Sequence, residues 1–350
     1  MTQNNKLRKA HGKEIFPDQG EMPKKIRVSS GTAAILNLSN DRLNVKPTTA
    51  YLMTYKVGKC TANCAFCPQA RGSESGADLL SRVSWPIYPT QNVIAALEEA
   101  VRSQEIGRVC IQGINYPSVF VHISELVKEI KKHARASISV SCQPLKAENI
   151  LVLKEAGADR LGIALDAATS ALFENIKGNK AGCPYDWLGQ FRLLEEALKI
   201  FGKGKVSTHI IAGMGETEKD VIELIQKCVD MTVLPALFAF TPIHGAKMEN
   251  NSPPVLESYR RLQLGRYLLA EGLTRFENMN FDVEDKITSF AVPMKDLLRV
   301  VETGAPFLTS GCSNCNRPFY NEKPSGPLYN YPRTLRHEEI EKIKKQLGLC

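Results

Sequence analysis

Short apolar runs alternate with longer amphipathic runs along the chain from residue 51 onward. The apolar runs have the length of buried strands, and the amphipathic runs have apolar residues at helical spacing. This alternation is typical of repeated strand–helix units around a parallel sheet. Strands are expected near 51–57, 108–114, 138–142, 160–166, 205–213 and 236–243, with a seventh near 275–281.

Helices are expected between these strands, at 92–103, 122–133, 147–157, 187–202, 218–231 and 257–272. Six or seven such units predict an α/β fold, a partial or full (β/α) TIM-type barrel, whose usual size is about 250 residues. An open doubly wound sheet is the competing geometry.

The two ends of the chain differ from this pattern. Residues 1–50 show weak periodicity and are assigned to an N-terminal extension, and residues 51–303 to the barrel. Residues 304–350 contain three cysteines and are assigned to a cysteine-containing C-terminal tail. Its first part, 304–335, is rich in Gly, Pro, Asn and Tyr. A long segment of this composition needs something to hold it in place.

The net charge of +8 comes mostly from the ends, with seven basic and three acidic residues in 1–27 and seven and four in 317–349. No basic stripe with interleaved aromatics accompanies it, so nucleic acid is not an expected partner. The charged ends are either solvated surfaces or docking sites for an acidic protein.

Location follows from what the sequence lacks. No run approaches about 20 apolar residues, so no membrane span is expected. The first twenty residues are polar and basic, unlike a secretory signal, and the expected compartment is therefore the cytoplasm. Thiols stay reduced there, so clustered cysteines suggest a metal rather than disulfides.

Three of the ten cysteines lie within eight residues, in the segment KCTANCAFCPQA after the first expected strand. The spacing is Cys60-x3-Cys64-x2-Cys67. Three thiolates on one loop can reach one inorganic centre, and thiolates are the ligands of iron–sulfur clusters. A [4Fe–4S] cluster with three such ligands keeps one iron open. A zinc loop is the alternative, but zinc sites normally have four ligands and CxxC pairs.

With this loop, the chain resembles radical S-adenosylmethionine (SAM) enzymes of the biotin synthase and lipoyl synthase branch over roughly residues 50–285. The resemblance implies that Cys60, Cys64 and Cys67 hold a [4Fe–4S] cluster whose open iron binds SAM. One electron then cleaves SAM to methionine and a 5′-deoxyadenosyl radical. It also implies that Phe66 lies near the adenine.

Further matches to this branch lie at the ends of two expected strands. Asp166 matches a carboxylate that binds the ribose hydroxyls, and Ile211, Gly213 and Glu216 match a stretch near the adenine. Other roles are open, since Asp166 could cap the next helix and the glycine and glutamate could serve a strand-to-helix turn.

The resemblance extends to a second cluster. Cys110 and Cys142 stand where biotin synthase has two ligands of its [2Fe–2S] cluster. His209 or Thr208 occupies the place of its third cysteine, and Arg275 is the candidate counterpart of its arginine ligand. Both cysteines could instead be small buried hydrophobic residues.

The tail offers other ligands for such a cluster. Cys312 and Cys315 form a half-site for zinc or iron–sulfur, which Cys350, Cys110 or Cys142 could complete. Cys350 could instead be an exposed terminus without a role. Arg317 and Tyr320 follow the pair and could hold the tail against the barrel. A biotin-synthase-like core with this tail most resembles one subunit of a two-component (split) lipoyl synthase.

That resemblance implies sulfur insertion into an unactivated C–H bond of a protein-bound octanoyl chain, in lipoyl cofactor biosynthesis, with sulfur donated by the auxiliary cluster. The implied partners are a second homologous subunit, an octanoylated lipoyl carrier protein and a small electron donor such as ferredoxin or flavodoxin. Leu237, Phe238 and Phe240 could line a site for the acyl chain, or be strand core.

Other functions remain open. A single-cluster enzyme of the same branch, similar to methylornithine synthase or to the hydrogenase maturase, needs no sulfur-donating cluster. A biotin-synthase-like sulfurtransferase and a non-enzymatic iron–sulfur scaffold are further candidates. RNA methylthiolation is disfavoured because its enzymes normally carry RNA-binding domains that this sequence lacks.

Overall fold

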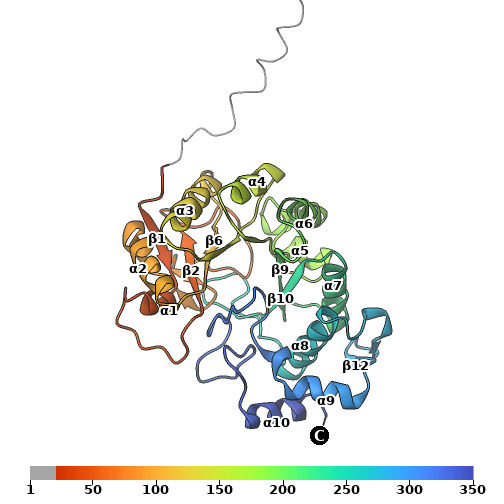
Figure 1. The fold of residues 1–350 in the computed structure, drawn as a ribbon. Coiled ribbons are helices and arrows are strands. Elements are labelled where there is room, and N and C mark those ends of the chain that lie inside the picture. The colour runs from red at the N-terminus through yellow and green to blue at the C-terminus, as the bar shows by residue number, and fades with distance from the viewer. Residues whose placement is uncertain (1–20, 350) are drawn as a thin grey trace, which may run out of the picture.

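The main sheet of the protein curves into a partial barrel with helices on its outer side (Figure 1). The structure is a computed structural model that describes residues 21–349. The strand order is β10-β9-β8-β7-β6-β2-β1-β5, with parallel pairing from β2 to β10. The parallel strands are β2 (Thr49–Thr54), β6 (Arg108–Gln112), β7 (Ser137–Ser141), β8 (Arg160–Gly162), β9 (Val206–Ala212) and β10 (Leu234–Ala239). The expected α/β fold is confirmed in its partial-barrel form, because the sheet ends at β10 and β5.

The seventh expected strand does not join this sheet. Residues 276–278 form a 3₁₀ turn, and β11 (Asn280–Phe281) pairs only with β12 (Ile287–Ser289) in a separate hairpin. Apolar and polar residues alternate in this segment, which suits a hairpin with one solvated face. A strand covered on both faces, as in the barrel, is apolar nearly throughout.

The six expected helices are all present on the outer side of the sheet (Figure 1). In α7, for example, Thr217 and Asp220 form a capping box and the buried side is apolar. The helices that follow the strands are α2 (Thr90–Arg102), α3 (Val119–His133), α4 (Ala147–Glu155), α6 (Trp187–Phe201), α7 (Glu218–Asp230) and α8 (Leu256–Ala270). A shorter helix, α5 (Ser170–Ile176), which the sequence pattern did not predict, lies between β8 and α6.

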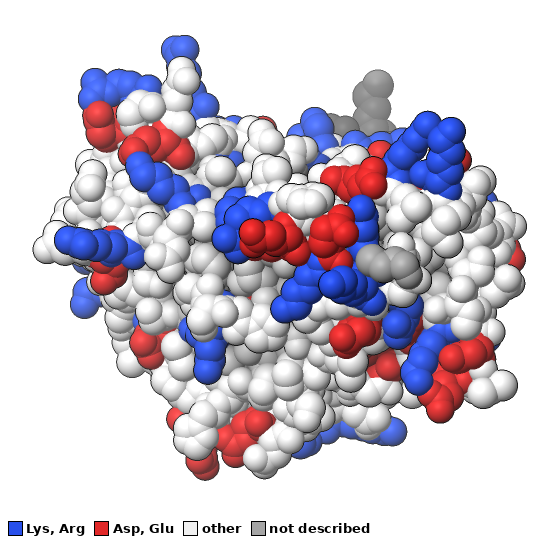
Figure 2. Space-filling view, turned by 90° about the horizontal axis from the view of Figure 1, so that it is seen from below, with Lys and Arg blue, Asp and Glu red and all other residues white. Residues whose placement is uncertain are grey.

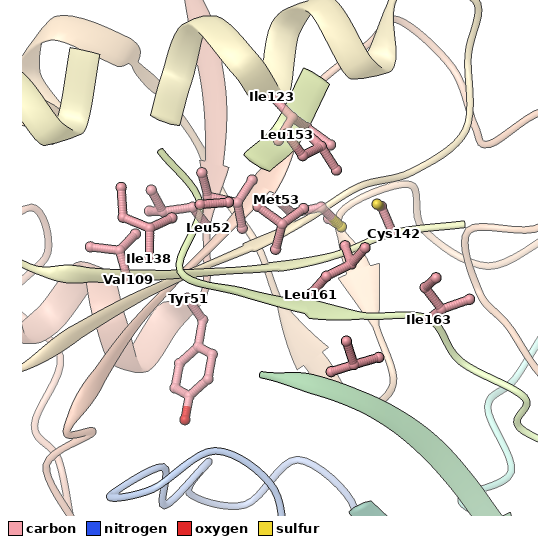
Figure 3. Packing of buried hydrophobic residues seen from close by; sticks show 14 of the residues in the cluster. Tyr51, Leu52, Met53, Val109, Ile123, Ile138, Cys142, Leu153, Leu161 and Ile163 are labelled. Atoms are coloured by element: carbon pink, nitrogen blue, oxygen red, sulfur yellow. The ribbon is translucent and has the colours of Figure 1, made fainter. Parts of the chain in front are cut away.

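Side chains alternate between the two faces of the sheet, and the faces have different roles. All six residues of β2 are buried. Figure 3 shows Leu52, Val109 and Ile138 packed on the helix side, whereas Tyr51 points the other way, toward the C-terminal segment. The inner face therefore carries side chains that are free for a role other than packing against the helices.

The described part of the N-terminal extension belongs to the fold. Strand β1 (Lys25–Val28) pairs antiparallel with β2 and with β5 (Ile87–Pro89), and helix α1 (Ser30–Ile35) follows it. Two very short strands, β3 (Leu79–Leu80) and β4 (Val83–Ser84), form a small hairpin before β5. Strands β1 and β5 thus extend the main sheet beyond β2, where the parallel strands begin.

The tail lies across the open side of the barrel, between β2 and β10 (Figure 1). At one end the backbone N–H of Thr48 donates to Asn316 Oδ1 at 3.0 Å. At the other, Ser310 Oγ accepts from the N–H of Leu237 at 2.8 Å, and Asn321 Nδ2 donates to the carbonyl of Ala239 at 2.9 Å. The tail therefore closes the gap that further strands close in a full barrel.

Two helices anchor the tail on α8. These are α9 (Met294–Glu302) and α10 (His337–Gln346), which bury Leu297, Val301 and Ile343 in a cluster with residues of α8. Many basic residues here are ion-paired, as Arg333 is with Glu339 at 2.8 Å. Figure 2 shows basic and acidic side chains interspersed on the face seen from below.

Among the residues that the structure describes, no helix is long and apolar enough to cross a membrane.

Candidate active site

One cavity of about 280 Å³ lies inside the partial barrel, at the carboxyl ends of the strands and under the tail. Ligands of parallel α/β barrels bind at this end because loops from several strands converge there. Two separate groups of cysteines line the cavity: Cys60, Cys64 and Cys67 after β2, and Cys110, Cys312 and Cys315 from β6 and the tail.

The first group lies on the cysteine loop, residues 55–72, which leaves β2 toward the cavity. Tight turns fold it, since the N–H of Cys67 donates to the carbonyl of Cys64 and that of Ala70 to the carbonyl of Cys67, both at 3.1 Å. The sulfur of Cys60 accepts two backbone N–H bonds, from Asn115 at 3.1 Å and from Ala62 at 3.4 Å. Burial raises the pKa of the Cys60 thiol, and these two N–H groups, which favour the thiolate, offset part of that rise.

This donor set fits an iron–sulfur cluster better than a single ion. Among residues 21–349 no three His, Cys, Asp or Glu side chains are grouped closely enough to hold one metal ion. Thiolates that bind different irons of a cluster lie farther apart than the ligands of one ion. The wider separation of the three thiols on this loop therefore suits a cluster. Burial raises the pKa of the Cys67 thiol to about 12, so a cationic centre is needed to keep it deprotonated.

The residues expected around the nucleoside lie beside the first group. Phe66, Asp166 and Ile211 all line the cavity. Asp166 follows β8, has a positive φ of 65°, and lines the cavity. The carboxylate pairs with the ammonium of Lys177 at 2.6 Å, and both side chains are almost completely buried.

Gly213 and Glu216 have a different place. The Glu216 carboxylate accepts hydrogen bonds from the N–H groups of Gly213 and Met214, which fixes the turn between β9 and α7. Gly213 has φ 103°, and a Cβ there would lie 2.7 Å from the ring of Pro254. Neither residue is among those that line the cavity, so the structure supports their role in the turn.

The second group joins the barrel to the tail, and we call Cys110, Cys312 and Cys315 the auxiliary group. Cys315 Sγ lies 3.2 Å from Tyr51 Oη on β2, and Cys312 Sγ lies 3.5 Å from Ser139 Oγ on β7. Burial raises the pKa of Cys110, and the neighbouring thiols Cys315 and Cys312 raise it further. The three thiols therefore share one electrostatic environment, although about 200 residues separate Cys110 from Cys312 and Cys315 in sequence.

Arg317 lies beside the auxiliary group and was expected only to hold the tail. Its guanidinium carbon lies 3.9 Å from the centre of the Phe238 ring, and its Nε is buried without a hydrogen-bond partner. His209 packs against the same ring at 4.9 Å. Burial, with a contribution from Arg317, lowers the pKa of His209 to about 4, so the imidazole is neutral at physiological pH.

The other candidate ligands differ in their positions. Cys142 also lines the cavity, but it is 4% exposed, packs in the hydrophobic core, and has its pKa raised by burial alone, with no contribution from the auxiliary group. Arg275 is exposed and forms an ion pair with Asp230 at 3.0 Å, so it does not act as a buried ligand. Cys350 lies outside the described residues.

Two of the three residues expected at the apolar wall line the cavity. Phe238 and Phe240 line the cavity. Leu237 is 1% exposed and is not among the lining residues, because successive side chains of β10 alternate between the two faces of the sheet.

Three further residues of the site escaped prediction. Lys177 and Tyr185 line the cavity, and Cys183 lies behind the cysteine loop with its sulfur 3.9 Å from that of Cys64. All three follow α5, a helix that the sequence pattern did not separate from the loop around it. The basic and aromatic residues of the run 177–187 were the available indication, but such runs are common in surface loops.

Comparisons with known proteins agree with this geometry. A family model described as the Radical SAM superfamily matches residues 55–228. Biotin synthase from Anoxybacillus flavithermus (strain DSM 21510 / WK1) is 29% identical over 249 residues, which are 62% of this chain and 69% of that protein. Biotin synthase from Hydrogenobaculum sp. (strain Y04AAS1) is 26% identical over 228 residues, 62% of this chain and 63% of that protein. The match thus spans less than two thirds of the Hydrogenobaculum protein.

Two solved structures share the fold. Methylornithine synthase (PylB) superposes with a TM-score of 0.50 at 15% identity, over 69% of this chain and 67% of that chain. The FeFe-hydrogenase maturase HydG from Carboxydothermus hydrogenoformans superposes with a TM-score of 0.51 at 12% identity, over 91% of this chain and 81% of that chain. At these identities the likeness concerns the fold alone. With its three-cysteine loop, its partial barrel and its biotin synthase homologues, the chain contains a domain of the radical SAM superfamily at residues 55–228.

Proposed function

We propose that this protein is a radical SAM sulfurtransferase that inserts sulfur into an unactivated C–H bond of a protein-bound octanoyl chain. The observation that carries the proposal is that the auxiliary group lines the same cavity as Cys60, Cys64 and Cys67. A substrate bound between the two groups would be near both a source of radicals and a source of sulfide. Such proximity is the main contribution a protein makes to a reaction of this kind.

The first group would hold a [4Fe–4S] cluster and SAM, which together supply a radical able to take hydrogen from an unreactive carbon. Asp166 and Lys177 would orient the nucleoside and the amino-acid part of SAM through a carboxylate and an ammonium on the same wall. Phe66 and Ile211 would pack against the adenine.

The auxiliary group would hold a second iron–sulfur cluster, the sulfur donor. Its three thiols approach from β6 and from the tail, so the cluster site is complete only when the tail is in place. Phe238 and Phe240 would contact the alkyl chain, and the tail would exclude water from the cavity. Lys177 and Arg317 then place one cation near each of the two cysteine groups.

The proposed partners are a second homologous subunit, an octanoylated lipoyl carrier protein and a small electron donor. The excess of basic residues at both chain ends supports an acidic partner. At the C-terminal end, however, ion pairs such as Arg333–Glu339 and Lys344–Glu341 leave less free positive charge than the sequence suggested. Docking would therefore depend on more than net charge.

A biotin-synthase-like reaction on a small molecule is the second candidate, because the curated relatives named above are biotin synthases. The ligand pattern argues against an identical site. Cys110 and Cys142 both line the cavity, but the tail thiols Cys312 and Cys315 line it as well, and His209 stands on β9 where a third cysteine was expected.

The test is an anaerobic assay with SAM, a reductant and an octanoyl-lysyl peptide, followed by mass spectrometry. The proposal predicts a peptide product that has gained sulfur in the wild type and in the control Cys228→Ser, whose thiol is buried outside the cavity. Cys312→Ala/Cys315→Ala should still cleave SAM but give no sulfur product. SAM cleavage without sulfur insertion by the wild type, also with candidate partners present, would favour the single-cluster enzymes.

A further inference from the structure

Cys183 lies next to a cluster ligand but does not face the cavity. Its sulfur is 3.9 Å from that of Cys64, and its side chain is 4% exposed. Cys64 is half-buried and lines the cavity, whereas Cys183 is not among the lining residues. Cys183 therefore stands behind the cysteine loop, where it cannot reach the open side of a cluster held by Cys60, Cys64 and Cys67.

The two thiols are held together by the surrounding backbone. The N–H of Asn63 donates to Cys183 Sγ at 3.1 Å, and Asn63 Nδ2 donates to the carbonyl of Ala181 at 2.8 Å. The N–H of Ala65 donates to the carbonyl of Ile176 at 2.7 Å. These bonds involve residues on both sides of Cys64, so the contact between the segments does not depend on a cluster.

We propose that Cys64 and Cys183 form a disulfide when the protein holds no cluster, and that this disulfide blocks cluster loading until it is reduced. A disulfide needs a sulfur–sulfur distance of about 2.05 Å. The remaining approach of about 2 Å is within reach of rotation about the two Cα–Cβ bonds. The inference is independent of the sulfur-insertion proposal and requires only that Cys64 is a cluster ligand.

The chemistry needs an oxidant, and a low-molecular-weight disulfide such as glutathione disulfide supplies it. The thiolate of Cys64, reached through the cavity, attacks one sulfur of glutathione disulfide, forms a mixed disulfide and releases one glutathione. The thiolate of Cys183 then attacks Cys64 Sγ and releases the second glutathione. Two protein thiols are oxidised, one glutathione disulfide is reduced to two thiols, and both protons pass to solvent or glutathione.

The consequence for the site is the loss of one of three ligands. Cys60 and Cys67 alone would leave two irons of a cluster without thiolates, and such a cluster would not assemble on the loop. The bond would also protect Cys64 from irreversible oxidation while the site is empty, because a disulfide is reversible and the sulfinic and sulfonic acids are not.

The direct test maps disulfides in the full-length chain. The cluster is removed anaerobically with a chelator and reductant, the reductant is exchanged out, and glutathione disulfide is added. After acid quenching and alkylation, peptide mass spectrometry should find Cys64 linked to Cys183 as the main disulfide. A main product that links Cys64 to Cys60 or Cys67, or a lasting glutathione adduct on Cys64, would overturn the proposal.

The loading test uses Cys110→Ala/Cys312→Ala/Cys315→Ala, which leaves one cluster site of about four irons. After oxidation this chain should take up almost no iron until a dithiol reductant is added. Adding Cys183→Ser should abolish this block, whereas adding Cys228→Ser, a matched buried thiol that is 0% exposed, should preserve it. Equal iron uptake before and after reduction in the parent chain would contradict the proposal. The wild-type disulfide map decides the matter even if a variant fails to fold.

Discussion

The phenol oxygen of Tyr51 lies 3.2 Å from the sulfur of Cys315 and also accepts a hydrogen bond from the backbone N–H of Arg317 at 2.9 Å. Tyr51 is 1% exposed and lies on β2, the strand that precedes the cysteine loop. A single buried hydroxyl thus connects the strand that leads to the first cysteine group with the tail that carries most of the auxiliary group.

Removal of this hydroxyl tests the connection. Tyr51→Phe should lower the free energy of unfolding by about 1–3 kcal/mol, because the buried N–H of Arg317 loses its acceptor. Iron bound by the auxiliary group should fall while iron at Cys60, Cys64 and Cys67 is retained. Denaturant unfolding and iron analysis measure both effects. Tyr267→Phe, on α8 and outside the cavity, serves as the control, and equal iron loss in both variants would contradict the link.

The buried pair Asp166–Lys177 gives a second prediction. Lys177→Met leaves a buried carboxylate without its cation and should cost about 3–5 kcal/mol of stability, measured by urea unfolding. The double variant Asp166→Asn/Lys177→Met removes both charges and should recover a large part of that loss. If the double variant is as unstable as the sum of the two single variants, the pair is not coupled as the 2.6 Å distance indicates.

The turn after β9 gives a third prediction, with a matched control two residues away. Gly213 and Gly215 both have positive φ, 103° and 123°, so Ala at either position costs about 1–2 kcal/mol of backbone strain. Only at Gly213 would the new Cβ meet Pro254, at 2.7 Å, whereas nothing lies within 4 Å at Gly215. Gly213→Ala should therefore be the more destabilising by about 1–3 kcal/mol in thermal or urea unfolding. Equal losses of stability in the two variants would show that Pro254 moves aside without a cost in free energy.

The anchor of the tail predicts a dependence on pH. Arg333, the N–H of Arg336 and its guanidinium lower the pKa of Glu339 to about 2. Because the folded pKa lies below the ordinary value of about 4.3, this stabilisation is complete above that pH and is lost as the pH falls toward 2. Glu339→Gln should lower the free energy of unfolding by about 1 kcal/mol at neutral pH. Between about pH 4.3 and 2 the variant should lose less stability than the wild type.

Urea unfolding as a function of pH checks this prediction. Glu338→Gln is the control, since the neighbouring side chain is exposed and no hydrogen bond or ion pair is described for it. An unchanged pH profile in Glu339→Gln, or the same change in Glu338→Gln, would show that the ion pair with Arg333 does not stabilise the tail.

Most of the fold was predictable because apolar periodicity reports burial. The parallel strands and the long helices have strong patterns of this kind, and their predicted positions are confirmed within a few residues. The segment 275–281 was mistaken for a barrel strand because alternating apolar and polar residues also occur in a short hairpin, and the pattern does not identify the pairing partner β12. The tail position was not predictable, since it depends on hydrogen bonds such as Thr48–Asn316 between residues far apart in sequence.

The site was predictable where its residues are close in sequence. Cys60, Cys64 and Cys67 are recognisable by spacing, but the auxiliary group combines Cys110 on β6 with two tail cysteines, and only the folded chain brings them to one cavity. Lys177 and Cys183 carried no spacing pattern, and their proximity to the cysteine loop arises from backbone contacts around Asn63 and Ala65.

The measurement that tests the central claim most directly is iron and sulfide per chain after anaerobic reconstitution of two triple variants. In Cys60→Ala/Cys64→Ala/Cys67→Ala, an independent auxiliary cluster should retain iron and sulfide, up to about four of each for a [4Fe–4S] type. In Cys110→Ala/Cys312→Ala/Cys315→Ala, the other cluster should retain about four irons. If the first variant binds no iron, the auxiliary group is not a cluster site, and the proposal of sulfur insertion from it is wrong.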